Sequence, residues 1–232
     1  MKNGSIISIE NLVKRFPIGG GEFTALNGIN LLFAKGEFTG IVGPSGSGKT
    51  TLLNILGSLD SPTEGVTEVL GTSSANMTAK LAATLRKQRI GFIFQTYNLM
   101  PVYTVFENVE FPLLLLTTPA AERRKAVLEA LEWVGLSDKI KSKPPMLSGG
   151  ESQRVAIARA MVKKPDLVLA DEPTANLDAE NSHHILQTME KLNKELETTF
   201  VFATHDDKVI GYLRRIIRLE DGKVVSDENI KN

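Results

Sequence analysis

One glycine-rich segment constrains this chain more than any other, because its composition suits phosphate and its setting is structurally defined. Residues 43–50 fit the phosphate-loop pattern G-x-x-x-x-G-K-[ST] at every fixed position. The apolar run 38–42 before it is typical of a buried strand, and residues 51–56 after it are typical of a helix. Glycines let successive backbone N–H groups turn inward and form an anion cradle at the start of that helix. We therefore expect a nucleoside triphosphate to bind here.

The chemistry of this loop falls to two side chains. Lys49 can reach the β- and γ-phosphates, and the Thr50 hydroxyl can ligate Mg²⁺. The alternative, a loop rich in glycine and serine that binds nothing, does not account for the strand and helix on either side. The residues expected to surround the nucleotide are Gly43, Pro44, Ser45, Gly46, Ser47, Gly48, Lys49, Thr50 and Thr51.

Composition excludes several classes of partner and site. Lys plus Arg and Asp plus Glu both number 27, so no basic excess indicates nucleic acid, and we expect no nucleic-acid partner. The chain has no cysteine, which excludes disulfides and thiolate-bound zinc. Residues 1–5 lack the apolar region of a secretion signal, and the apolar stretch 111–116 is too short to span a bilayer. We expect a cytoplasmic chain that needs a partner to hold it at a membrane.

Alternating strand and helix patterns indicate an α/β fold with a parallel sheet covered on both faces. The helix-rich middle of the chain is expected to form a lobe inserted into the sequence of that sheet, and the early strands a separate antiparallel sheet. We expect one domain over residues 1–232, with its core at about 1–95 and 163–232 and the lobe at 96–162. The expected strands are 6–12, 29–33, 38–42, 66–70, 90–94, 167–170, 199–203, 214–219 and 223–226, and the expected helices are 77–87, 105–116, 120–134, 149–162 and 179–197.

A second candidate site follows the apolar strand 167–170. Asp171 and Glu172 come directly after it, so their carboxylates are expected at the C-terminal edge of the sheet, where α/β folds bind ligands. Asp171 suits Mg²⁺, held through water, and Glu172 suits a base toward the attacking water. Alone, a strand that ends in Asp-Glu is more often a surface loop. The phosphate loop favours the functional interpretation.

A third segment, residues 147–154, begins a helix in an unusual way. Ser148 and Glu151 form an S-x-x-E capping box, which needs no functional explanation. Gly149 and Gly150 are different, because each glycine in a first helical turn costs roughly 1 kcal/mol relative to alanine. Close approach of a second phosphate ligand to the helix N-terminus would account for them.

Together these segments resemble the ATP-binding cassette (ABC) ATPases over essentially the whole chain. Residues 43–50 resemble the Walker A motif, 147–151 the LSGGQ signature and 167–172 the Walker B motif with its catalytic glutamate. The resemblance implies a phosphate-loop NTPase core of parallel strands, an N-terminal antiparallel β subdomain and an inserted α-helical subdomain. Glu151 stands where the family usually has glutamine, and His183-His184 matches no family role and is expected on an exposed helix face.

The same resemblance assigns roles to further residues. Gln95 resembles the glutamine that meets Mg²⁺ and the attacking water, and His205 resembles the switch histidine that contacts the γ-phosphate. Asp178 is similar to the residue that communicates across the family's dimer. Phe16 stands at the adenine-stacking position, although ordinary core packing is the other interpretation of that ring.

The family's working unit is a head-to-tail pair of subunits, which implies a homodimer of this chain with two MgATP at its interface. Ser148, Gly149, Gly150 and Glu151 would then contact the nucleotide held by the partner subunit. Glu172 would orient or deprotonate water, while Lys49, Mg²⁺ and His205 would stabilise charge on the transferred phosphoryl group.

Within the family, residues 94–101, 104–113 and 170–178 resemble the bacterial lipoprotein-release and macrolide-export subgroup. That resemblance implies an integral membrane permease with a large extracytoplasmic domain, which would dock on the exposed part of residues 97–116. A non-transporting regulator of the cell-division type is the alternative. Soluble ATPases of DNA repair or translation carry a coiled-coil insertion or two cassettes, which this chain lacks, and a guanine-reading N-K-x-D motif is absent.

Overall fold

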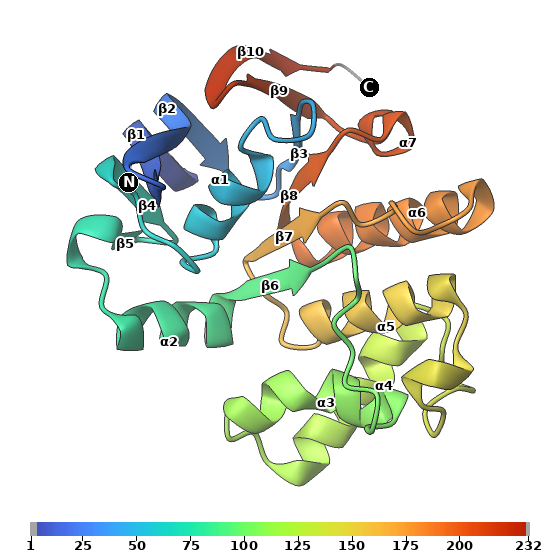
Figure 1. Cartoon of the computed structure of the whole chain (residues 1–232). Coiled ribbons are helices and arrows are strands. Elements are labelled where there is room, and N and C mark those ends of the chain that lie inside the picture. The colour runs from blue at the N-terminus through green and yellow to red at the C-terminus, as the bar shows by residue number, and fades with distance from the viewer. Residues whose placement is uncertain (1–3, 231–232) are drawn as a thin grey trace.

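The N-terminal sheet is antiparallel and is built around two long strands, β1 (Ser5–Ile18) and β2 (Gly21–Ala34) (Figure 1). The computed structural model describes residues 4–230, so residues 1–3 of the segment considered for a secretion signal lie outside the described residues. The remaining edge of β1 pairs with β4 (Glu64–Val69), which pairs with β5 (Thr72–Ser73). The predicted strands 6–12 and 29–33 were too short. Register shifts between Ile9 and Arg15 interrupt the alternation that would have revealed the full length of β1.

A six-stranded core sheet has the order β10-β9-β3-β8-β7-β6. Its strands are β3 (Phe38–Val42), β6 (Ile90–Ile93), β7 (Leu167–Asp171), β8 (Thr199–Thr204), β9 (Arg215–Glu220) and β10 (Lys223–Asn229). Neighbours from β9 to β6 are parallel, and β10 returns antiparallel to β9. The prediction of a parallel core with a separate antiparallel sheet is confirmed.

Both faces of the core sheet are buried, because successive side chains of its strands enter different apolar clusters. Phe38 and Phe200 pack against the helical layer, whereas Ile41 and Val201 pack toward the N-terminal sheet. All of these side chains are fully inaccessible to solvent. This arrangement explains why the strands are apolar throughout instead of alternating with polar residues.

Helices on the two sides of the core sheet differ in origin. α1 (Lys49–Leu56) contacts β2 as well as β7 and β8, so it lies between the two sheets. α2 (Ala79–Arg89) follows the short 3₁₀ turn η1 (Ser74–Asn76) and leads into β6. On the other side, α6 (Ala179–Leu196) contacts α5 and the short α7 (Asp207–Ile210). The turns η1 and α7 were not predicted, because so few residues show no periodic pattern.

The helix-rich middle of the chain comprises α3 (Val105–Leu115), α4 (Ala120–Trp133), the 3₁₀ turn η2 (Pro144–Met146) and α5 (Gly149–Met161). The three α-helices contact one another, and α5 also contacts β6 and α6 (Figure 1). Capping boxes start α3 at Thr104 and α5 at Ser148. Across residues 4–230, none of the helices combines the length and apolar character needed to cross a bilayer.

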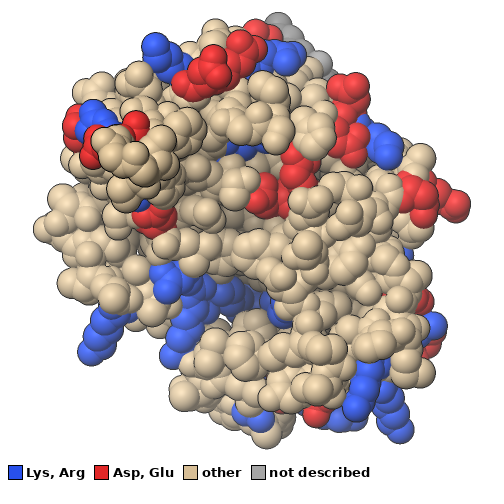
Figure 2. Space-filling view, in the orientation of Figure 1, with Lys and Arg blue, Asp and Glu red and all other residues tan. Residues whose placement is uncertain are grey.

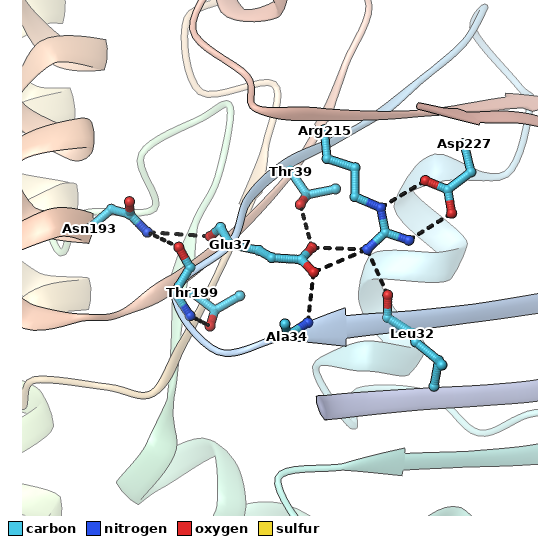
Figure 3. Close-up of polar contacts among 9 residues, drawn as sticks. Leu32, Ala34, Glu37, Thr39, Asn193, Thr199, Arg215 and Asp227 are labelled. Carbon is cyan, nitrogen blue, oxygen red and sulfur yellow. Dashed lines mark hydrogen bonds and ion pairs between the residues drawn. The ribbon is translucent and has the colours of Figure 1, made fainter. Parts of the chain in front are cut away.

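Arg215 joins the two sheets through a polar network at the N-terminal end of β3 (Figure 3). Its guanidinium binds Asp227 of β10 through two contacts of 2.7 Å, approaches Glu37 to 3.0 Å and donates to the Leu32 carbonyl at 2.7 Å. Glu37 also accepts from the Ala34 N–H at 2.8 Å. The end of β2, the entry to β3 and the β9–β10 hairpin are therefore tied to one side chain.

Candidate active site

The C-terminal ends of four neighbouring parallel strands, β3, β8, β7 and β6, meet at one edge of the core sheet. The phosphate loop follows β3, and Gln95 follows β6. Asp171 is the last residue of β7 and Glu172 comes next, while His205 follows β8. A cleft of about 450 Å³ lies among them. Parallel pairing therefore brings together side chains that lie far apart in sequence, at the edge where α/β folds bind ligands.

At two positions of the loop, nearby backbone atoms leave no room for a side chain and so require glycine. A Cβ on Gly43 would lie 2.0 Å from the Leu219 carbonyl oxygen of β9, so the loop passes too close to β9 for any side chain. Gly48 caps α1 with a φ of 104°, and a Cβ there would lie 2.6 Å from the Ala25 oxygen. Ser45, Gly46, Gly48 and Thr51 line the cleft, whereas Gly43, Pro44 and Ser47 do not.

Lys49 and Ser47 give this loop the character of an anion site. The Lys49 ammonium donates to the Gly43 and Pro44 carbonyls at 2.7 and 2.9 Å, without a carboxylate partner among the described residues. The Ser47 hydroxyl is buried and has no hydrogen-bond partner within the described part of the chain. A buried cation beside a helix N-terminus and an orphaned hydroxyl fit a polyphosphate.

Thr50 and Asp171 supply oxygen atoms suited to Mg²⁺. The Thr50 hydroxyl donates to an Asp171 carboxylate oxygen at 3.2 Å. Burial raises the pKa of Asp171 above its usual range, which an adjacent cation would reverse. No cluster of three acidic, histidine or cysteine side chains suited to a metal occurs among residues 4–230. The Thr50 hydroxyl and the Asp171 carboxylate nevertheless fit Mg²⁺, because this ion keeps several waters and binds substrate phosphates alongside one or two protein ligands.

Glu172 is held by two residues of the β8 end. One carboxylate oxygen lies 2.5 Å from His205 Nδ1, and the other accepts from the Thr204 hydroxyl at 3.1 Å. Glu172 itself has a φ of 45°, in the left-handed region that is uncommon for a residue with a side chain. The Glu172 side chain is 14% exposed and that of His205 is 67% exposed, so the imidazole is free to turn toward a ligand in the cleft.

Gln95 lines the same cleft, and its backbone is tied to the segment after β7. The Asn176 side-chain amide donates to the Gln95 carbonyl at 2.9 Å. The segment that carries Asp171 and Glu172 and the segment that carries Gln95 are thus connected directly. The sequence did not indicate Asn176, because this bond joins residues 81 positions apart.

An aromatic ring lines the cleft from β2, where the sequence reasoning named a residue of β1. Phe23 and Ala25 are lining residues, whereas Phe16 is not. Phe16 lies directly opposite Phe23 in the β1–β2 register, with the Lys14 ammonium 4.9 Å from the centre of its ring. Phe23 was missed because only the cross-strand register places it beside the residue named from sequence.

Ser148, Gly149, Gly150 and Glu151 begin α5 and do not line the cleft. The capping box is present in both directions: Ser148 N–H donates to Glu151 at 2.8 Å, and Glu151 N–H donates to the Ser148 hydroxyl at 3.2 Å. These bonds and the Lys139 ammonium lower the pKa of Glu151. Gly150 is buried, and a Cβ there would lie 2.3 Å from Asn181 Oδ1, so packing against α6 explains this glycine. Close approach of a ligand is therefore needed to explain only Gly149, which is exposed.

Asp178 and the two adjacent histidines lie on α6 or at its start. Asp178 caps the helix by accepting from the Asn181 N–H at 2.8 Å, and this bond lowers the pKa of Asp178. His183 contacts the Tyr212 hydroxyl and the Gln187 amide. His183 and His184 are both exposed on α6, as expected for a helix face.

Comparison with known proteins identifies the family to which this architecture belongs. The model of the ABC transporter family matches residues 26–175. The lipoprotein-releasing system ATP-binding protein LolD of Pseudoalteromonas translucida is 45% identical over 227 residues, which is 98% of each chain. The macrolide export ATP-binding/permease protein MacB of Burkholderia pseudomallei is 40% identical over 97% of this chain and 34% of its own length.

A solved structure resembles this chain along almost its whole length. The dimeric post-hydrolysis state of the ATP-binding cassette MJ0796, bound to ADP and Pi, has a TM-score of 0.90 at 41% identity, covering 97% of this chain and 99% of that one. These similarities agree with the fold and with the positions of the phosphate loop, the Walker B strand and the signature helix. The chain therefore belongs to the ABC transporter family as one of its ATP-hydrolysing cassettes.

Proposed function

We propose that this chain is the subunit that powers a membrane complex of the lipoprotein-release or macrolide-export type. The similarity to a lipoprotein-releasing ATP-binding protein over 98% of both chains carries this proposal. Residues 1–232 act as a single domain, with a nucleotide-binding core at about 1–95 and 163–232 and a helical subdomain at 96–162.

The working form is a homodimer with two ATP at its interface. The position of the signature segment supports this, because Ser148 to Glu151 lie outside the cleft that Lys49 lines. A second copy, arranged head to tail, brings Ser148, Gly149, Gly150 and Glu151 to the nucleotide held by the first. MJ0796, a cassette of similar structure, has been solved as a dimer. Asp178, which caps α6 and binds Asn181, the neighbour of Gly150, communicates between the two copies.

Hydrolysis follows from residues already close together. Phosphates displace the Lys49 ammonium from the Gly43 and Pro44 carbonyls and take up the N–H groups at the start of α1. Glu172, which keeps its hydrogen bond from the Thr204 hydroxyl, orients or deprotonates the attacking water. His205 turns from Glu172 to the γ-phosphate, and Gln95 positions the water. Thr50, Gln95 and, through water, Asp171 would hold Mg²⁺, which would neutralise phosphate charge.

A groove of about 530 Å³ on another face is suited to a protein segment. It lies between α2, β6, α3 and α5, and its apolar lining includes Phe92, Met100, Phe111 and Leu115. Phe111 and Leu115 are 38% and 50% exposed, so these side chains pack only partly inside the subunit. We assign this groove to the cytoplasmic segment of an integral membrane permease with a large extracytoplasmic domain, which holds the cassette at the inner face of the membrane.

The charge of the groove defines the chemistry of that segment. Arg86, Lys87, Arg159 and Lys163 line it, without an acidic lining residue. Figure 2 shows this hollow edged by Lys and Arg side chains, with Asp and Glu elsewhere on the same face. Arg86 and Lys163 donate to backbone carbonyls, at 2.5 Å each, and neither forms an ion pair within the described residues. An amphipathic helix with carboxylates beside its apolar face complements this surface.

The test is co-purification from solubilised native membranes with tagged Glu172→Gln and MgATP. We expect that variant to bind ATP, dimerise, hydrolyse poorly and retain a few-helix membrane protein with an extracytoplasmic domain. Phe111→Asp in the same background is expected to lose the membrane protein while keeping ATP-dependent dimerisation. A partner that controls cell-wall hydrolases would favour the non-transporting alternative. Reproducible capture of soluble proteins alone contradicts the membrane assignment.

A further inference from the structure

The loop that carries Gln95 contains an unfavourable backbone conformation two residues further on. Tyr97 and Asn98 have φ values of 59° and 49°, so two consecutive residues with side chains occupy the left-handed region. Asparagine tolerates this region, but a bulky side chain such as that of tyrosine rarely adopts it. Such a conformation persists only where surrounding contacts enforce it.

Local hydrogen bonds from the Tyr97 and Asn98 N–H groups close the turn, and Arg159 of α5 binds the carbonyls of the same two residues. Its guanidinium donates to the Tyr97 carbonyl at 2.6 Å and to the Asn98 carbonyl at 2.5 Å. The side chain forms no ion pair among residues 4–230, and burial lowers the pKa of Arg159. A desolvated cation whose fork spans the carbonyls of two successive residues fixes the peptide between them.

This fixed peptide connects to the catalytic cleft on one side and to the signature segment on the other. Gln95, which lines the cleft, is two residues before Tyr97, and its carbonyl accepts from Asn176. The Tyr97 hydroxyl lies beside Gly149, 3.1 Å from where a Cβ would stand. The backbone of residues 97 and 98 thus lies between Gln95 in the cleft and the start of the signature helix.

We propose that Arg159 is a positioning residue for ATP hydrolysis: it holds residues 97 and 98 in the left-handed conformation and thereby places Gln95 in the cleft. The inference rests on the role proposed above for Gln95. Arg159 does not line the cleft, so it acts through backbone geometry and not by contact with the nucleotide.

The experiment is a double-mutant cycle in the steady-state ATPase activity of the full chain. Arg159→Gln is expected to lower kcat about tenfold with KM for MgATP within about twofold, because the change displaces a group that acts on water and not one that binds ATP. Tyr97→Gly keeps the carbonyl that Arg159 binds but adopts a positive φ without help. In the Tyr97→Gly background, Arg159→Gln is therefore expected to lower kcat less than about threefold.

Two controls separate positioning from general destabilisation. Arg123→Gln removes a partly buried arginine of α4 that binds Glu110 and the Thr118 carbonyl but does not touch residues 95–98, and kcat is expected to stay unchanged. Arg159→Lys keeps the charge without the two-carbonyl fork and serves if the glutamine variant does not fold. We expect it to lose part of the activity.

Equal losses of kcat in the two backgrounds would overturn the inference, as would unchanged kcat in a folded Arg159→Gln. The inference would also be overturned if kcat fell in step with the thermal midpoint in both Arg159→Gln and Arg123→Gln. Failure of the proposed function has a different signature, since it leaves this cycle intact while Glu172→Gln neither dimerises with ATP nor retains a membrane protein.

Discussion

Arg215→Met is expected to lower the free energy of unfolding by about 3 kcal/mol, because methionine keeps the apolar stem but removes the guanidinium. The Asp227 pair is partly exposed and contributes about 0.5–1 kcal/mol. The Glu37 contact joins side chains that are 13% and 23% exposed, and hydrogen bonds between charged groups at such sites contribute about 1.5–3 kcal/mol. Glu37 keeps the Thr39 hydroxyl and the Ala34 N–H as donors, so its carboxylate is not left bare.

The same substitution is expected to reach the nucleotide site through the β9–β10 hairpin. The Gly222 N–H donates to the Ser47 carbonyl at 3.1 Å, and the Gly222 carbonyl accepts from Asn27 at 2.8 Å. Removal of Arg215 takes away one tie between β10 and the rest of the core, although β10 stays paired with β9, and we expect this to weaken the support of the phosphate loop. We expect the Kd for MgATP to rise about threefold to tenfold, within the usual range of coupling between sites.

Equilibrium unfolding in urea, followed by circular dichroism, measures the first effect. With a slope of about 2 kcal/mol per molar urea, a loss of 3 kcal/mol shifts the midpoint by roughly 1.5 M. Asp227→Asn, which removes only the exposed pair, is the matched control, with an expected loss below about 1 kcal/mol. A loss for Arg215→Met no larger than that of the control would refute the assignment of most of the energy to Glu37.

Three further predictions concern single residues. Phe23→Ala is expected to weaken MgATP binding about threefold to tenfold by fluorescence titration, because a half-exposed ring of the cleft stacks on the base; a loss confined to Phe16→Ala would instead favour the residue named from sequence. Burial lowers the pKa of Lys163 from 10.5 to about 8, so between these values the unfolded chain holds a proton that the folded chain has lost, and stability rises with pH across that window. Urea unfolding between pH 7.5 and 10.5 is expected to show a gain of up to about 3 kcal/mol in the free energy of unfolding, which Lys163→Met abolishes. The same dependence of stability on pH in both proteins would count against this assignment. Gly43→Ala is expected to raise the Kd for MgATP at least a hundredfold, because the new Cβ would stand 2.0 Å from the Leu219 oxygen and must displace the loop; near-normal affinity by calorimetry would show that β9 yields instead.

Features that depend on neighbouring residues could be predicted from the sequence. The phosphate loop between β3 and α1, the capping box of Ser148 and Glu151, and the hairpin at Gly222 were all expected, and all are present. Each is determined within a few residues by backbone conformation, by side-chain capping or by the period of the apolar pattern. The exceptions include β1 and β2, which were predicted too short because register shifts interrupt their pairing, and the short turns η1 and α7.

Features that depend on contacts between distant segments were decided only by the tertiary structure. Strand order places Glu172 beside His205, and the β1–β2 register places Phe23 in the cleft. Gly150 is required because Asn181 of α6 packs directly against it. The sequence also named Gln95 without showing that Arg159, 64 positions away, holds its loop. A motif specifies which groups are present because its spacing is local, whereas their geometry depends on strand order and helix packing, which many distant apolar contacts determine together.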